Sequence, residues 1–438
     1  MIYLLFVLLL LLLIIIIYIE NLDLLCPPSI ICAMWLFSTI CAIYNVDKWN
    51  IHLSFETLFL IITGISTFSI GFFCFYRTPI KTITLKKKAK NFNYISLQEI
   101  SVNWIIIWIL IFLGVITIFF QLNWIFKISD SDSWLDMMWS YRKYNSTWRT
   151  TSLISKPSFI VDLEFLLRVD SLFTSYIGVN NLIVTQKKRY FLLFIPGILY
   201  SIDTLLNAGR GNILLYLGGV VLAIYVIAGQ KYSWKKKRTI KFVKWFVLAG
   251  VLLLLLFSTS RTLVGRIDSS NIIDYITSYV GGSIQLFDLY VKNPIPKSTI
   301  WGKETFAPFI IWLGNKLHKP EWIYLTHLEF RSSNGVEIGN VYGTFRYYLQ
   351  DFGFLGMLIL TLFSSFFFAI LYKKIKKRKF YPSDGYNWFI FFYMIYGPAL
   401  FMHPISDYTY SFLCQIVFYG KYILYAWILK KITINISN

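Results

Sequence analysis

Long apolar segments alternate with short polar or basic segments along almost the whole chain. A helix of about 20 apolar residues crosses a hydrocarbon core of ~30 Å, and segments of that length recur through the 438 residues. Spanning strands would instead give short segments of alternating polarity. The pattern therefore predicts an all-α, polytopic integral membrane protein with about 11 transmembrane helices, at 2–19, 27–44, 57–76, 104–126, 159–184, 190–206, 212–229, 243–257, 352–372, 387–402 and 410–429.

One long polar segment, 258–351, interrupts this pattern late in the chain. It divides the sequence into 1–257 with transmembrane helices 1–8, a large loop at 258–351, and 352–438 with helices 9–11. A transporter rarely needs so long a loop in the second half of its sequence, whereas an enzyme that works at the membrane surface does. The loop therefore favours an enzyme.

The net charge of +20 changes the picture less than its size suggests. The basic residues stand in short blocks between apolar segments, so we interpret them as topology signals and contacts with anionic lipid, and we expect no nucleic-acid binding. These blocks fall on alternate loops, as the positive-inside rule requires. They place the loop at 258–351, the turns at 207–211 and 403–409, and the N-terminus outside the cytoplasm.

Several arginines are expected on this outer face, where the positive-inside rule gives no reason for a cation. Arg210 stands between Gly209 and Gly211 at the start of a predicted helix, whose first N–H groups and dipole favour an anion. Its planar guanidinium fits a phosphate, although an arginine that snorkels to lipid headgroups is the simpler interpretation. The other candidate ligands for a diphosphate are Arg261, Arg266, Arg331 and Arg346.

Candidate general bases lie on the same face. No metal-binding motif is visible in the sequence, so we expect neither a metal nor a cofactor, and arginine would stabilise a departing diphosphate. A base must reach the attacking hydroxyl, and the sequence leaves the choice open. The favoured candidates are His327, Glu337, Asp351 and His403, with His318, Glu329 and Asp407 as further possibilities. In the fifth predicted helix, Glu164 and Arg168 share a face and can form an ion pair.

Two sequence elements resemble a known family. They are the Arg-Gly turn at 209–211 and the pattern that runs from Asn340 and Tyr342 through Asp351 to Gly353. Together with the late outer loop, they resemble the Wzy-type polymerases of O-antigen and capsule synthesis, which share their architecture with O-antigen ligases. Many relatives have a serine beside the arginine where this chain has Ala208-Gly209, so only Arg210 and its glycines carry over.

The resemblance implies a metal-independent membrane glycosyltransferase with a GT-C-like architecture, in the bacterial inner membrane. Such an enzyme takes a glycan from undecaprenyl diphosphate at the outer face and passes it to a hydroxyl of the next lipid-linked repeat unit. Its partners would be undecaprenyl-diphosphate-linked oligosaccharide, membrane lipid and a chain-length regulator protein. The alternatives are an O-antigen ligase with the same donor and, less favoured, a flippase for lipid-linked oligosaccharide.

Overall fold

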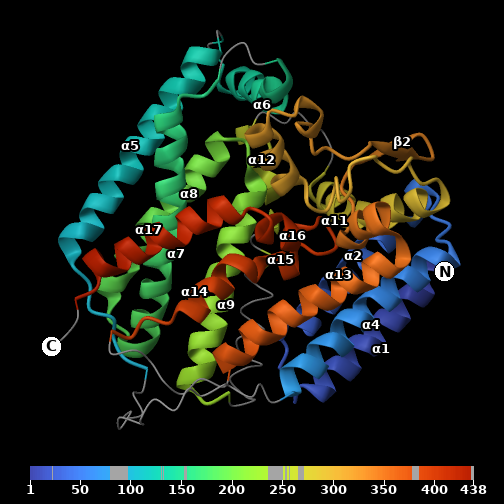
Figure 1. Ribbon diagram of the computed structural model, residues 1–438, viewed down its shortest axis with the longest axis horizontal. Helices are drawn as coiled ribbons and strands as arrows, with labels where there is room; N and C mark the ends of the chain where they lie inside the picture. The colour runs from blue at the N-terminus through green and yellow to red at the C-terminus, as the bar shows by residue number, and fades with distance from the viewer. Residues whose placement is uncertain are drawn as a thin grey trace.

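The protein is nearly all-α in its computed structural model (Figure 1). The structure describes the chain except for 22, 79–96, 130, 132, 152–154, 235–249, 252–253, 256, 265–270, 377–383 and 436–438, and except for the side chains of 145–151 and 262. Within the described residues, one small sheet is formed by the hairpin of β1 (Arg331–Ser333) and β2 (Val336–Gly339).

Seven helices of the described chain are long and apolar enough to cross a membrane, which confirms a multi-pass membrane protein. They are α1 (Ile2–Ile19), α2 (Pro27–Tyr44), α4 (Phe55–Arg77), α5 (Trp104–Ile128), the continuous pair η1 (Lys188–Phe194) and α8 (Ile195–Leu206), α9 (Arg210–Lys231) and α13 (Thr344–Lys376).

The other helices include further counterparts of the predicted spans. Shorter or more polar helices coincide with the predicted fifth, tenth and eleventh spans, and most of the predicted helix at 243–257 lies outside the described residues. The remaining described helices, whether or not they match a predicted span, are α3 (Val46–Trp49), α6 (Trp134–Thr151), α7 (Ser158–Thr185), η2 (Thr262–Val264), α11 (Ile272–Lys292), α12 (Ala307–Leu317), η3 (Pro320–Trp322), α14 (Trp388–Tyr396), α15 (Pro398–Phe401), α16 (Tyr408–Leu413) and α17 (Ile416–Thr433).

The helices α1, α4 and α13 run in parallel and end at one face of the bundle. Arg77 at the end of α4 donates to the carbonyl of Ile19, and Lys376 at the end of α13 forms an ion pair with Asp23. The beginning of α1 therefore lies at the opposite end, together with the beginning of α13 and the loop that precedes it (Figure 1).

The segment predicted as one polar loop contains a helix that packs into the bundle. In α11, Gly281 lies so close to α2 that a β-carbon there would stand 2.5 Å from the backbone nitrogen of Ala42. Ser38 on α2 donates to the carbonyl of Val280 across 2.8 Å. The average polarity of the segment conceals this helix, because only one face of α11 is apolar; that face buries Ile284 and Phe287.

The helix α13 is interrupted at Gly353, which adopts φ 67° and ψ −169°. A positive φ is open to glycine at little cost, so the glycine of the Asp-Phe-Gly pattern marks a kink. The nine residues before it, 344–352, form a separate helical segment that begins earlier than the predicted span at 352–372.

Candidate functional site

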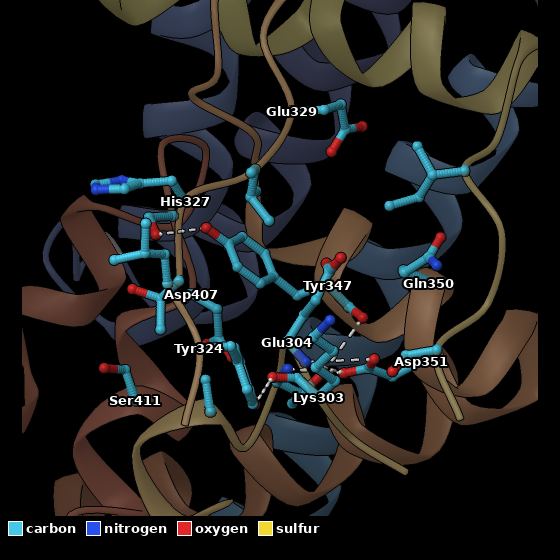
Figure 2. Close-up of a pocket in the computed structure, with 18 of the residues that line it drawn as sticks. Lys303, Glu304, Tyr324, His327, Glu329, Tyr347, Gln350, Asp351, Asp407 and Ser411 are labelled. Carbon is cyan, nitrogen blue, oxygen red and sulfur yellow. Dashed lines mark hydrogen bonds between the residues drawn. The ribbon is translucent and has the colours of Figure 1, made fainter. Parts of the chain in front are cut away.

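A polar cavity of about 420 Å³ lies where the residues before α12, the first turns of α13 and the turn before α16 meet. Figure 2 shows side chains from all three regions around it. Carboxyl, hydroxyl and amide groups predominate among its polar lining residues, which include Lys303, Glu304, Tyr324, His327, Glu329, Tyr347, Gln350, Asp351, Ser406, Asp407 and Ser411. Such a lining matches the hydroxyl groups of a sugar better than it matches an anion.

Arg346 supports this cavity from within the protein. Its side chain is fully buried and forms ion pairs with Glu304 and with Glu329, the latter at 2.7 Å from Nη2. The guanidinium also lies 4.8 Å from the ring centre of Tyr290 and 4.9 Å from that of Tyr342. Two carboxylates thus balance its charge, and the geometry gives it a structural role instead of the predicted contact with a diphosphate.

Arg331 is similarly engaged by the protein. It lies 3.2 Å from a carboxylate oxygen of Glu329 and donates to the backbone carbonyls of Leu289 and Asn293. These contacts connect the β-hairpin to the end of α11. The structure therefore brings Arg331 and Arg346 together on Glu329 and not around an open phosphate site.

Two aspartates line the cavity, and their carboxylates differ in their hydrogen-bond partners. The carboxylate of Asp351 accepts backbone N–H groups of Thr305 at 2.7 Å and Glu304 at 3.0 Å, so it fixes the turn before α12. Asp407 is 6% exposed, and its Oδ1 accepts from Thr409, Tyr410 and the Tyr348 hydroxyl. Within the described residues, Oδ2 of Asp407 has no hydrogen-bond partner.

Burial also changes the acidity of Asp407. Loss of solvation disfavours the charged carboxylate and raises its pKa to about 7. A carboxylate with this pKa can accept a proton near neutral pH. Asp407 lines the cavity and keeps one buried oxygen without a partner, so it is the lining carboxyl group best suited to accept a proton.

The predicted histidine bases lie in contrasting places. His327 is exposed and lines the cavity. His403 is buried outside the lining, and its Nδ1 accepts a 2.9 Å hydrogen bond from the Trp35 indole. Burial lowers the pKa of His403 to about 3, so the ring is neutral. His318 is an exposed residue at the end of α12.

Of the two favoured acidic bases, the structure places Asp351 but not Glu337 at the cavity, and the further candidates Glu329 and Asp407 line it as well. Glu337 is exposed on β2, where it stands opposite Ser332 in the hairpin. The structure thus brings together His327 and Asp351, and it leaves Glu337 and His403 apart from them. Glu304 was missed, because nothing in its local sequence indicates that it will meet Arg346.

The residues of the Asn-x-Tyr pattern form the frame of the cavity. Asn340 donates to the carbonyl of Leu328 at 3.4 Å, and the Tyr342 hydroxyl donates to that of Glu329 at 3.3 Å. Thr344 donates to the carbonyl of His403 through both its backbone N–H and its hydroxyl. This motif therefore connects three walls of the cavity.

The predicted Arg-Gly turn forms a second arrangement. The positive φ of this turn, 55°, belongs to Ala208 and not to either glycine. Arg210 is buried at the first turn of α9, donates to the Phe257 carbonyl and the Tyr275 hydroxyl, and lies 4.2 Å from the Phe257 ring centre.

Tyr275 brings a second arginine to this arrangement. The guanidinium carbons of Arg210 and Arg261 each lie 5.5 Å from the ring centre of Tyr275. Two of the predicted diphosphate ligands are therefore neighbours, whereas Arg266 lies outside the described residues.

One turn, 405–408, separates the arginine pair from the cavity. Ser406 and Asp407 line the cavity. Ile405 and Tyr408 line a small apolar cleft of about 60 Å³ on the other side, together with Gly211 and Phe257. The acidic and basic parts of the site are thus adjacent but distinct.

The predicted Glu164–Arg168 pair takes another form. Glu164 forms an ion pair with Lys156 and accepts from Asn207 at 2.7 Å, while Arg168 lies 5.1 Å from the Phe418 ring centre. Within the described residues, no group of three His, Cys, Asp or Glu side chains is arranged to hold a metal ion.

Comparison of the chain with protein-family models, with curated proteins and with solved structures finds no match. Conclusions about function therefore depend on the site itself.

Proposed function

We propose that this protein is a polymerase that joins undecaprenyl-diphosphate-linked oligosaccharide repeat units at the outer face of the bacterial cytoplasmic membrane. The polysaccharide product would be an O-antigen or a capsule. The proposal includes the finer architecture expected from the sequence, with about 11 spans and a GT-C-like arrangement, and a chain-length regulator as a partner.

One observation carries the proposal: a buried carboxylate with an unpartnered oxygen lies on one side of the 405–408 turn, and a pair of arginines lies on the other side. Asp407 lines a cavity rich in hydroxyl and carboxyl groups. Arg210 and Arg261 meet at Tyr275 beyond the 405–408 turn. A glycosyl transfer from a lipid diphosphate needs both a proton acceptor for the attacking hydroxyl and positive charge for the leaving group.

The polar groups of the cavity and of the arginine pair suit different parts of the substrates. The cavity wall carries the carboxyl groups of Glu304, Glu329, Asp351 and Asp407, to which a sugar can donate its hydroxyl hydrogens. The arginine pair provides planar donors that match phosphate oxygens. We therefore assign the acceptor sugar to the cavity and the donor diphosphate to the arginine side.

The reaction then balances as follows. An acceptor hydroxyl oxygen attacks the anomeric carbon of the donor glycan, and its proton passes to Oδ2 of Asp407. The bond between the anomeric carbon and the diphosphate oxygen breaks, and the electron pair leaves with undecaprenyl diphosphate. Arg210 and Arg261 stabilise the negative charge that develops on that oxygen.

The test is the surface glycan of a strain that lacks this protein. A single capped repeat unit supports a polymerase, whereas free polymer on its lipid indicates a ligase and absence of surface repeats indicates a flippase. A complementing Asp407→Asn variant at matched protein level should also leave single repeats. A normal ladder of chain lengths from that variant would remove Asp407 from the reaction.

A further inference from the structure

We propose that the apolar groove between α12 and the start of α17 binds the polyprenyl chain of the acceptor lipid, so that the groove and the polar cavity form one site for an amphiphile. This inference rests on the proposed function, because it names where the acceptor is held.

The groove has a volume of about 250 Å³, and its lining is almost entirely apolar. One wall is formed by Pro308, Phe309 and Trp312 of α12, and the other by 414–418 at the start of α17. Such walls pack against a hydrocarbon chain by dispersion contacts and leave few polar groups unpaired. The groove is therefore suited to a hydrocarbon chain and not to a polar ligand.

The groove lies directly beside the cavity. Pro308 lines both spaces, and α16, which leads into α17, contributes Ser411 to the cavity while Cys414 lines the groove. A ligand with a polar head and an apolar chain could therefore occupy both without a break. The positive end of the α12 dipole faces this junction, where the diphosphate that links head and chain would lie.

The outer end of the groove carries apolar side chains that are open to the surroundings. Ile416 is 66% exposed, Val417 43% and Trp312 38%. In a multi-pass membrane protein, exposed apolar residues at the end of an apolar helix are expected to contact lipid. A polyprenyl chain can thus enter sideways from the bilayer, without leaving the hydrocarbon.

The size and polarity of the cavity decide between a lipid-linked glycan and an ordinary phospholipid. Both ligands bring phosphate to the junction, so charge does not distinguish them. A cavity of about 420 Å³ lined by carboxyl, hydroxyl and amide groups, among them Asp351 and Asp407, matches the many hydroxyl groups of a glycan, whereas a phospholipid headgroup fills little of it. The position of the groove beside this cavity therefore favours a polyprenyl-linked glycan.

This placement also separates the acceptor chain from the donor chain. The cleft beside the arginine pair is lined by Phe257, Tyr279 and Tyr408, while the groove lies across the 405–408 turn, on the cavity side. Two lipid-linked substrates can then approach the same turn from different sides.

Photo-crosslinking of the full chain in lipid nanodiscs tests the groove directly. Trp312 and Val417 are replaced in turn by p-benzoylphenylalanine, and the probe is radiolabelled undecaprenyl phosphate. The matched control carries the same residue at Phe112, which is exposed on α5. We expect labelling at positions 312 and 417 that is lost on adding excess unlabelled undecaprenyl phosphate, and only uncompeted background at 112.

Two results would overturn the inference. One is equal, uncompeted labelling at all three positions, and the other is competition by phosphatidylglycerol as effective as that by undecaprenyl phosphate. The readout is independent of polymerisation. If labelling is competed but a turnover assay gives no polymer, the groove binds the lipid and the proposed function is wrong. If polymer forms but labelling is not competed, only the assignment of the groove is wrong.

Discussion

The indole nitrogen of Trp35 donates a 2.9 Å hydrogen bond to Nδ1 of His403, although the two residues stand 368 positions apart in the chain. This bond connects α2 to the turn that carries Asp407. It also requires a neutral acceptor nitrogen on His403, in agreement with the lowered pKa of the buried ring. We therefore expect His403 to position this turn and not to act as the base.

Trp35→Phe tests that role. The variant leaves the buried Nδ1 of His403 without its donor, which costs about 1–3 kcal/mol and should lower the melting temperature of the purified protein. If His403 is not the base, the pH profile of the remaining activity should keep its midpoint. Trp108→Phe, on an exposed face of α5, is the control and should melt like the wild type. A shifted pH midpoint in Trp35→Phe would contradict the assignment.

The length of the apolar segments made most of the bundle predictable, because a span of the bilayer leaves little freedom in helix length. α1 and α2 begin and end at the predicted residues. α11 was not predicted, because its apolar residues lie on one face and its average polarity resembles that of a loop. A close approach such as that of Gly281 to Ala42 follows from tertiary packing and cannot be read from either segment alone.

The residues of the site could be predicted only in part. The glycines on either side of Arg210 made it a candidate, and the positive-inside rule shows that an arginine on the outer face is unusual. The contrast between Arg346 and Arg261 could not be predicted. Nothing in the sequence around either arginine indicates its partners, and only the folded chain brings Glu304 and Glu329 to Arg346.

Arg346→Met should destabilise the protein strongly. It removes the shared partner of two carboxylates, and breaking a buried ion pair costs about 3–5 kcal/mol. The melting temperature in detergent measures this loss, and a triple variant that adds Glu304→Gln and Glu329→Gln should recover part of it. Arg189→Met is the control, since the Arg189–Glu99 pair is exposed and its loss should change little. If Arg346→Met melted normally but bound donor poorly, Arg346 would return as a phosphate ligand.

The proposed activity should depend on pH through Asp407. The base must be unprotonated, and its pKa is raised to about 7, so the initial rate should fall as the pH drops below about 7 and level off above it. Initial rates with a fixed lipid-linked substrate between pH 5 and 9 measure this profile. Asp407→Asn should be strongly impaired at every pH. A wild-type rate that stays constant from pH 5 to 8 would exclude Asp407 as the base.

The stability of the fold should show the opposite dependence. Because the pKa of Asp407 is higher in the folded state than its ordinary value, its contribution to stability is complete below about pH 4 and is lost as the pH rises through about 7. Asp407→Asn cannot ionise, so relative to the wild type its melting temperature should rise between pH 5 and pH 8. A constant difference between the two proteins would contradict the raised pKa.

Gly281→Ala should weaken the contact between α11 and α2. The added β-carbon would stand 2.5 Å from the Ala42 nitrogen, and crowding of this kind costs roughly 1–3 kcal/mol. The matched control is Gly420→Ala on α17, where the β-carbon meets no atom within 4 Å and alanine favours the helix. Thermal unfolding should separate the two variants, and equal melting temperatures would show that α11 shifts freely.

Arg210→Lys separates a diphosphate ligand from a purely structural arginine. Lysine is a point charge without the planar fork, so it cannot reproduce the contacts of Arg210 with both the Phe257 carbonyl and the Tyr275 hydroxyl. Some loss of stability is therefore expected whatever the function. The discriminating measurement is the rise in melting temperature on adding undecaprenyl diphosphate, because a ligand that binds the folded state stabilises it by mass action.

We expect this rise in the wild type, in the exposed control Arg189→Lys and in Tyr275→Phe, which loses the hydroxyl but keeps the ring. Arg210→Lys should lose the rise and give short glycans, and Arg210→Ala should leave single repeats. If Arg210 only holds the 257–275 contact, Tyr275→Phe and Arg210→Lys should lose stability together and both should keep the response to undecaprenyl diphosphate. That result would leave Arg261 as the remaining ligand of the described arginine pair, because Arg331 and Arg346 are engaged by Glu329.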